Sequence, residues 1–141
     1  MNMNIINRIL AVVLVISGLI PFMTTILAAT DQSMISEIFK FNTTPGTELQ
    51  VTYVILGAAS IFASFTQFLA AAWVWTGKAE GLKLSILVAT MLMTASFYIF
   101  IVLSKISVND PSLYAPDAIK GLLILALTIV ALKKRGNVES T

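Results

Sequence analysis

The chain has 141 residues, of which 57% are hydrophobic and 11% are charged, and its formal net charge at pH 7 is +2. A soluble domain usually carries about 25% charged residues, so this composition excludes an ordinary soluble globular domain. The sequence contains no cysteine and no histidine, which excludes disulfides, thiol chemistry, the usual haem ligand and the usual proton shuttle near neutral pH.

Four long apolar runs fill most of the chain. A helix needs ~20 apolar residues to cross the hydrocarbon core of a bilayer, and each run is close to that length. In chain order the runs span residues 9–29, 51–76, 84–104 and 116–132. The sequence therefore predicts an all-α integral membrane protein, a single domain in which four helices form an up-down-up-down bundle.

The first run contains Pro21, whose ring removes a backbone donor and crowds the carbonyl of Ser17. A packing kink is one interpretation, and a cavity wall or hinge is the other. After this run, residues 30–50 form the longest polar stretch. Apolar side chains recur there at helical spacing from Met34 to Phe41, which predicts a short amphipathic segment lying flat at the outer interface.

The second run carries a stripe of small and polar residues at spacings of four, three and four: Ser60, Ser64, Gln67 and Ala71. Small residues let helices approach, and an amide in lipid needs a partner, so this stripe is expected to face the bundle interior. With a rise of ~1.5 Å per residue, Gln67 lies at the depth of Thr90 in the third run, and Ser64 lies at the depth of Thr94.

Two interpretations of these polar side chains stay open: contacts that hold helices together, or the polar lining of a small-molecule pocket. The third run adds flexible methionines and aromatic residues, which suit adaptable apolar sites but also fill cores. The candidate ligand-binding residues are Ser64, Gln67, Thr90, Met93, Thr94 and Tyr98.

The fourth run is uncharged only over residues 121–132, so its helix is expected to begin near Pro116, a favoured first-turn residue. Asp117 then lies at the positive end of the helix, where a carboxylate is stabilised. Lys120 follows three residues later, at a spacing that predicts a local ion pair at the interface. The alternative is that Asp117 and Lys120 mark the polar mouth of a cavity.

The basic residues indicate the orientation in the membrane. Six of the nine fall at the N-terminus, in the second loop and at the C-terminus: Arg8, Lys78, Lys83, Lys133, Lys134 and Arg135. Since lysine and arginine favour the cytoplasmic side, both termini are predicted to be cytoplasmic. The expected location is the bacterial inner membrane.

No enzyme signature is found in the sequence, since paired carboxylates, a metal-ligand cluster and a phosphate-binding glycine loop do not occur. Neither a cofactor nor a nucleic-acid partner is expected. One hypothesis is a small non-catalytic scaffold or accessory subunit of a membrane complex, which contacts other subunits or a second copy of itself. The alternative is a binder or carrier of a small apolar or amphiphilic molecule, a quinone or lipid, in a pocket within the bundle.

Short motifs along the chain carry a family resemblance. They are Ser17–Pro21, Gly57, the turn Trp75–Lys78 and the opening of the fourth helix at Asp117–Gly121. In these features the chain resembles the small DoxX-like four-helix membrane proteins. The resemblance implies a compact bundle and little about activity, and the arginines that some relatives carry within their helices are absent here.

Overall fold

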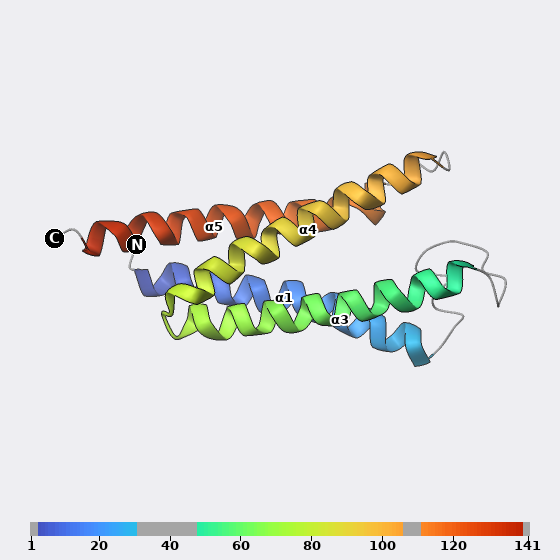
Figure 1. Cartoon of the computed structure of the whole chain (residues 1–141). Helices are drawn as coiled ribbons and strands as arrows, with labels where there is room; N and C mark the ends of the chain where they lie inside the picture. The colour runs from blue at the N-terminus through green and yellow to red at the C-terminus, as the bar shows by residue number, and fades with distance from the viewer. Residues whose placement is uncertain (1–2, 31–47, 106–110, 140–141) are drawn as a thin grey trace.

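The computed structural model describes residues 3–30, 48–105 and 111–139, all of which lie in helices or in the turns beside them (Figure 1). The elements are α1 (Met3–Thr30), α3 (Glu48–Trp75), α4 (Ala79–Lys105), the 3-10 helix η1 (Pro111–Leu113) and α5 (Ala115–Glu139). The predicted all-helical fold with four long helices is confirmed. The amphipathic segment expected within 30–50 falls on residues outside the described ranges.

Each of the four long helices contains a stretch that is long and apolar enough to cross a membrane. The stretches are Ile5–Leu27, Ala58–Trp75, Ala79–Ile101 and Ala115–Gly136. Large apolar side chains such as Phe62, Phe97 and Ile119 lie on the outside of the bundle, where a lipid solvent accommodates them. The chain is therefore a multi-pass integral membrane protein.

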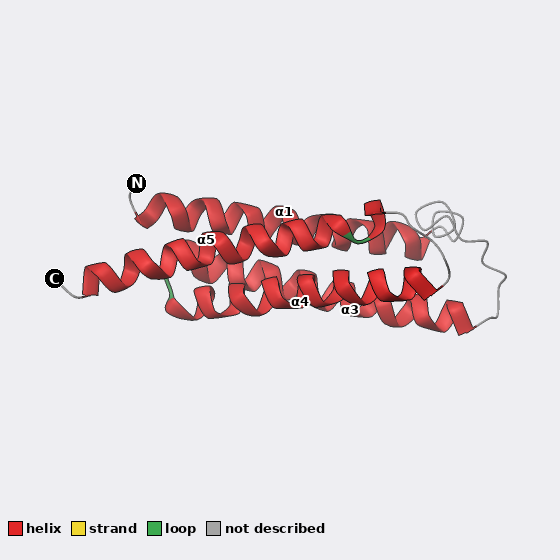
Figure 2. Cartoon of the chain, turned by 90° about the horizontal axis from the view of Figure 1, so that it is seen from above, coloured by secondary structure: helices red, strands yellow, loops and turns green. Residues whose placement is uncertain are grey.

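Each long helix packs mainly against two others, in the cyclic order α1, α3, α4, α5. Figure 1 shows both chain ends at the end of the bundle that also holds the turn between α3 and α4, and Figure 2 shows the same arrangement from above. Arg135 near the C-terminus donates a hydrogen bond to the carbonyl of Gly77 in that turn, at 3.3 Å. We call this end of the bundle the termini end.

Small side chains allow the helices to pack closely in the core. Alanines at 70, 71, 89 and 131 are buried together with the larger Leu10, Leu14, Val74 and Ile124. The buried hydroxyls of Ser64, Ser85 and Thr128 each donate to the carbonyl four residues earlier in their own helix, at 2.7–2.8 Å. These three hydroxyls are thus satisfied within their own helices, which suits an environment without water.

The turn between α3 and α4 ends α3 sharply. The amide of Lys78 bonds the carbonyl of Trp73, and the amide of Gly77 bonds that of Val74, which is the Schellman pattern of a helix C-terminus. Gly77 has φ +76°, a left-handed conformation that glycine adopts without the steric cost of a Cβ. α3 and α4 therefore form a tight antiparallel hairpin.

Candidate functional site

The polar stripe of α3 faces the bundle interior, as its spacing predicts. Ser64 and Gln67 are buried, and Gln67 exposes only 1% of its surface. Ser60 is half-buried, and its carbonyl accepts the hydrogen bond from the Ser64 hydroxyl at 2.8 Å. Two of the six candidate ligand-binding residues therefore lie inside the bundle.

Helix α1 approaches this stripe closely at Gly18. A Cβ atom placed on Gly18 would lie 3.0 Å from the Phe68 ring, 3.2 Å from the Cβ of Gln67 and 3.3 Å from the carbonyl oxygen of Ser64. The neighbouring Ser17 is also buried. Glycine at position 18 is what lets α1 and α3 touch at the middle of their membrane-spanning stretches.

Two buried polar atoms at this contact have no hydrogen-bond partner within the described residues: the hydroxyl oxygen of Ser17 and the amide oxygen Oε1 of Gln67. A buried polar group without a partner costs about 1–3 kcal/mol, and such groups are few in folded proteins. A third such atom within the described residues, Oδ1 of Asn7, lies nearer the start of α1.

The other four candidates lie elsewhere. Thr90, Met93, Thr94 and Tyr98 of α4 are exposed on the outside of the bundle, and Tyr98 exposes 62% of its surface. The hydroxyl of Thr90 donates to the carbonyl of Ile86 in its own helix, at 2.9 Å. The Met93 side chain packs over Gly121, since a Cβ there would lie 2.8 Å from the Cγ of Met93. The structure does not bring the six residues together into one intrabundle pocket.

The rotation of α4 about its axis explains this difference. Matching depths along two helices fixes height in the membrane but leaves open which side of each helix faces the partner. The buried positions of α4 include Ser85, Val88, Ala89, Leu92 and Ser96. Thr90 lies one residue past Ala89 and Thr94 two residues past Leu92, and ~100° of rotation per residue carries both outside.

A contact that the sequence did not suggest joins α4 to Tyr114, the residue just before α5. The hydroxyl of Ser96 donates to the carbonyl of Tyr114 at 2.6 Å, and the rings of Phe100 and Tyr114 pack edge-to-face at 5.3 Å. Ser96 carries no sequence signal of this role, because its partner is a backbone carbonyl. The contact fixes the end of the bundle opposite the termini end.

Asp117 and Lys120 form the local ion pair that their spacing predicts. The ammonium of Lys120 lies 2.9 Å from a carboxylate oxygen of Asp117, and the two side chains are 25% and 33% exposed. Asp117 occupies the first turn of α5, where the helix end favours a negative charge. The pair holds the Lys120 charge at the edge of the spanning stretch rather than in its centre.

The Lys120→Gln variant is expected to fold and insert almost as well as the unmodified chain. Partly exposed ion pairs contribute about 0–1 kcal/mol, so the midpoint of thermal unfolding in detergent should change by a few degrees at most. Helical content during heating is the measurement, and Asp117→Asn is the matched control. A large loss of folded protein in Lys120→Gln alone would show that Lys120 has another buried partner.

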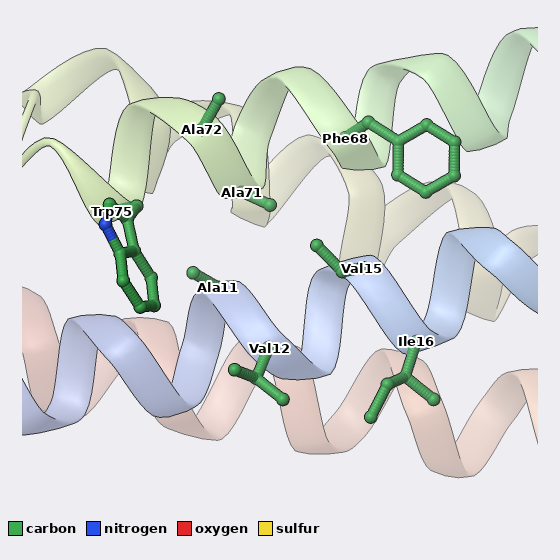
Figure 3. A pocket seen from close by; sticks show the side chains of 8 residues that line it. All are labelled: Ala11, Val12, Val15, Ile16, Phe68, Ala71, Ala72 and Trp75. Carbon is green, nitrogen blue, oxygen red and sulfur yellow. The ribbon is translucent and has the colours of Figure 1, made fainter.

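An apolar groove runs over the outer surface where α1 and α3 meet (Figure 3). Its volume is about 340 Å³, and it is lined by Ala11, Val12, Val15, Ile16, Phe68, Ala71, Ala72 and Trp75. The guanidinium of Arg8 lies over the Trp75 ring, 5.5 Å from its centroid. The lining residues recur at helical spacing in both helices, but this spacing does not predict the groove, which depends on how the two helices pack.

The described ranges hold no group of three or more histidine, cysteine, aspartate or glutamate side chains that could hold a metal ion.

Gln67→Leu is expected to leave the free energy of unfolding unchanged within about 1 kcal/mol, or to raise it. The substitution removes a buried oxygen that has no partner, and interhelical hydrogen bonds in membranes average only ~0.6 kcal/mol. Thermal unfolding in mild detergent is the measurement, with Thr66→Val on the same helix as the control. A loss of several kcal/mol would reveal a strong partner for the amide.

Known proteins provide no template for the fold or for the site. No protein-family model matches the chain, and no curated protein or solved structure matches it.

Proposed function

We propose that this multi-pass membrane protein is a small non-catalytic scaffold or accessory subunit of a membrane complex. The observation that carries the proposal is a polar ridge on the outer face of α4, formed by Thr90, Thr94 and Tyr98, which follow one another at intervals of four residues and are all exposed. Residues four apart lie on the same face of a helix, so the ridge faces outward over two turns.

Hydroxyl groups on the outer face of a spanning helix suit contact with another helix. Thr90 already donates to the carbonyl of Ile86 in its own helix, but a neighbouring helix offers Thr94 and Tyr98 hydrogen-bond partners that lipid tails do not. Threonine is also enriched where membrane helices meet. Phe97 stands beside the ridge and is also exposed. The occupant favoured by this chemistry is a helix of another subunit or of a second copy.

The orientation of the proposed subunit follows from its charges. Arg8, Lys78 and the basic cluster Lys133–Arg135 belong to the termini end, which carries most of the basic residues. Because basic residues favour the cytoplasmic side, the proposal includes cytoplasmic termini, an up-down-up-down course and insertion in a bacterial inner membrane. The resemblance to DoxX-like proteins fits this architecture.

The competing hypothesis, a carrier with a pocket inside the bundle, has less support. Its six residues are divided between the interior of α3 and the exterior of α4. A pocket at Ser17 and Gln67 alone would offer two polar atoms at a closely packed helix contact.

Photo-cross-linking tests the proposal. A photoreactive side chain at Thr94 in the full chain is expected to form one discrete protein adduct in native membranes, identified by mass spectrometry as a membrane subunit or a second copy. The same group at Ile129, exposed on α5, is the control. The double variant Thr90→Leu, Thr94→Leu should reduce co-purification of that partner at least tenfold. Adducts with lipid alone at both positions would contradict the proposal.

A further inference from the structure

The groove between α1 and α3 is built from two matching stripes. On α1 the stripe is Ala11, Val12, Val15 and Ile16, and on α3 it is Phe68, Ala71, Ala72 and Trp75. Each follows the spacing of residues on one helix face. In Figure 3 the small side chains lie in the middle, between Trp75 at one end and Phe68 with Ile16 at the other.

The end of the groove at Trp75 carries a positive charge. Arg8 precedes Ala11 and Val12 by one helical turn on the same face of α1, and its guanidinium carbon lies over the Trp75 ring, 5.5 Å from the centroid. A guanidinium attracted to an aromatic ring still offers N–H donors, and their fork matches the geometry of a phosphate. Lys78, exposed in the turn that follows Trp75, adds to the positive charge of this end.

At the other end of the groove the lining ends at Phe68 and Ile16. Phe68 packs edge-to-face on Phe22 at 6.1 Å, and Phe22 packs on Phe65 at 5.9 Å. The groove thus stops near the middle of the α1 stretch Ile5–Leu27. From Phe68 to Trp75 the helix rises ~10 Å, which is shorter than the ~15 Å of hydrocarbon in one leaflet, half of the total thickness.

These dimensions distinguish between the possible occupants. A spanning helix would run along the bundle through both leaflets, whereas this groove lies in one leaflet and has its charge at the headgroup level. An acyl chain that descends from a phosphate has that shape. Basic residues at membrane interfaces recognise anionic lipid headgroups.

We infer that the groove binds an acyl chain of an anionic phospholipid from the leaflet at the termini end, with the phosphate held by the edge of the Arg8 guanidinium. The Trp75 ring orients the Arg8 guanidinium and contacts the part of the acyl chain nearest the phosphate. The site lies on α1 and α3, away from the polar ridge of α4, so the inference is independent of the proposed function.

Native mass spectrometry tests this inference. The full chain is reconstituted in vesicles with equal amounts of phosphatidylglycerol and phosphatidylcholine, extracted in mild detergent, and weighed with its retained lipid. The unmodified chain is expected to retain phosphatidylglycerol about fivefold over phosphatidylcholine, the factor that one basic side chain supplies near an anionic surface. Arg8→Gln should abolish that preference, and Lys83→Gln, at another exposed lysine of the same end, should keep it.

A second set of variants fills the groove with larger side chains. Ala72→Leu and, separately, Val12→Phe are expected to lower retention of both lipids at least fivefold, whereas Ala126→Leu on the exposed face of α5 should not. Helical content and elution volume show that each variant is folded. Equal retention in filled and unfilled grooves would overturn the inference. A dimer without lipid that Ala72→Leu dissociates would overturn it too, because a second copy would then be the occupant.

Discussion

Gly81→Ala is expected to destabilise the bundle by about 3 kcal/mol or more, above the usual range for an added methyl group in a packed core. A Cβ on Gly81 would lie 2.5 Å from the amide nitrogen of Val74 and 2.7 Å from the carbonyl carbon of Trp73. Both atoms belong to the backbone of α3, so no side-chain rotation relieves the clash. The hairpin of α3 and α4 would have to open.

Two other glycines provide a graded control for this prediction. Gly136→Ala places its Cβ where no atom lies within 4 Å, so it should be neutral or stabilise the helix by up to ~1 kcal/mol. Gly77→Ala also meets open space, but its φ of +76° strains an alanine by roughly 1–2 kcal/mol. Thermal unfolding and elution volume in one detergent give the order of the three variants.

This series of variants tests the close contact of α3 with α4. If the free energies of unfolding of Gly81→Ala and Gly136→Ala differ by less than 1 kcal/mol, α3 and α4 do not approach as closely as in the structure. If Gly77→Ala is the most damaging of the three, the turn conformation rather than the helix contact limits the stability of the hairpin.

The spanning helices could be predicted from the sequence because the bilayer imposes a length on each apolar run. Ion pairing of Asp117 with Lys120 was equally accessible, since both residues belong to one helix turn and need no knowledge of the tertiary fold. The burial of Ser64 and Gln67 followed from their shared helix face. In each case the evidence lies within one helix.

The sequence did not predict how each helix is rotated about its axis relative to the helices that pack against it. Thr90 and Thr94 match Gln67 and Ser64 in depth, yet they face outward because the rotation of α4 is set by Ala89 and Leu92 packing inward. The groove depends on which stripe of α1 meets which stripe of α3. Gly18 makes that register possible by its close contact with Phe68, and no single-helix pattern specifies it.

The second prediction with a large effect concerns the orientation of the chain in the membrane. Thiol labelling at each test position is expected to be either complete or absent. The chain has no cysteine, so single cysteines placed at Thr43, between α1 and α3, and at Gly136, at the exposed end of α5, report the two sides separately. A membrane-impermeant thiol reagent added to intact cells should label the Thr43→Cys variant fully and spare the Gly136→Cys variant.

The physical reason is the uneven placement of charge. Six basic residues belong to the termini, the α3–α4 turn or the first turns of α4, and three belong to the rest of the chain. Positive side chains resist transfer across the membrane, so the end with six stays on the side of synthesis. Permeabilised cells supply the control, because there Gly136→Cys must react as well. Labelling of Gly136→Cys in intact cells would reverse the orientation and place the proposed lipid groove, with Arg8 and Trp75, in the outer leaflet.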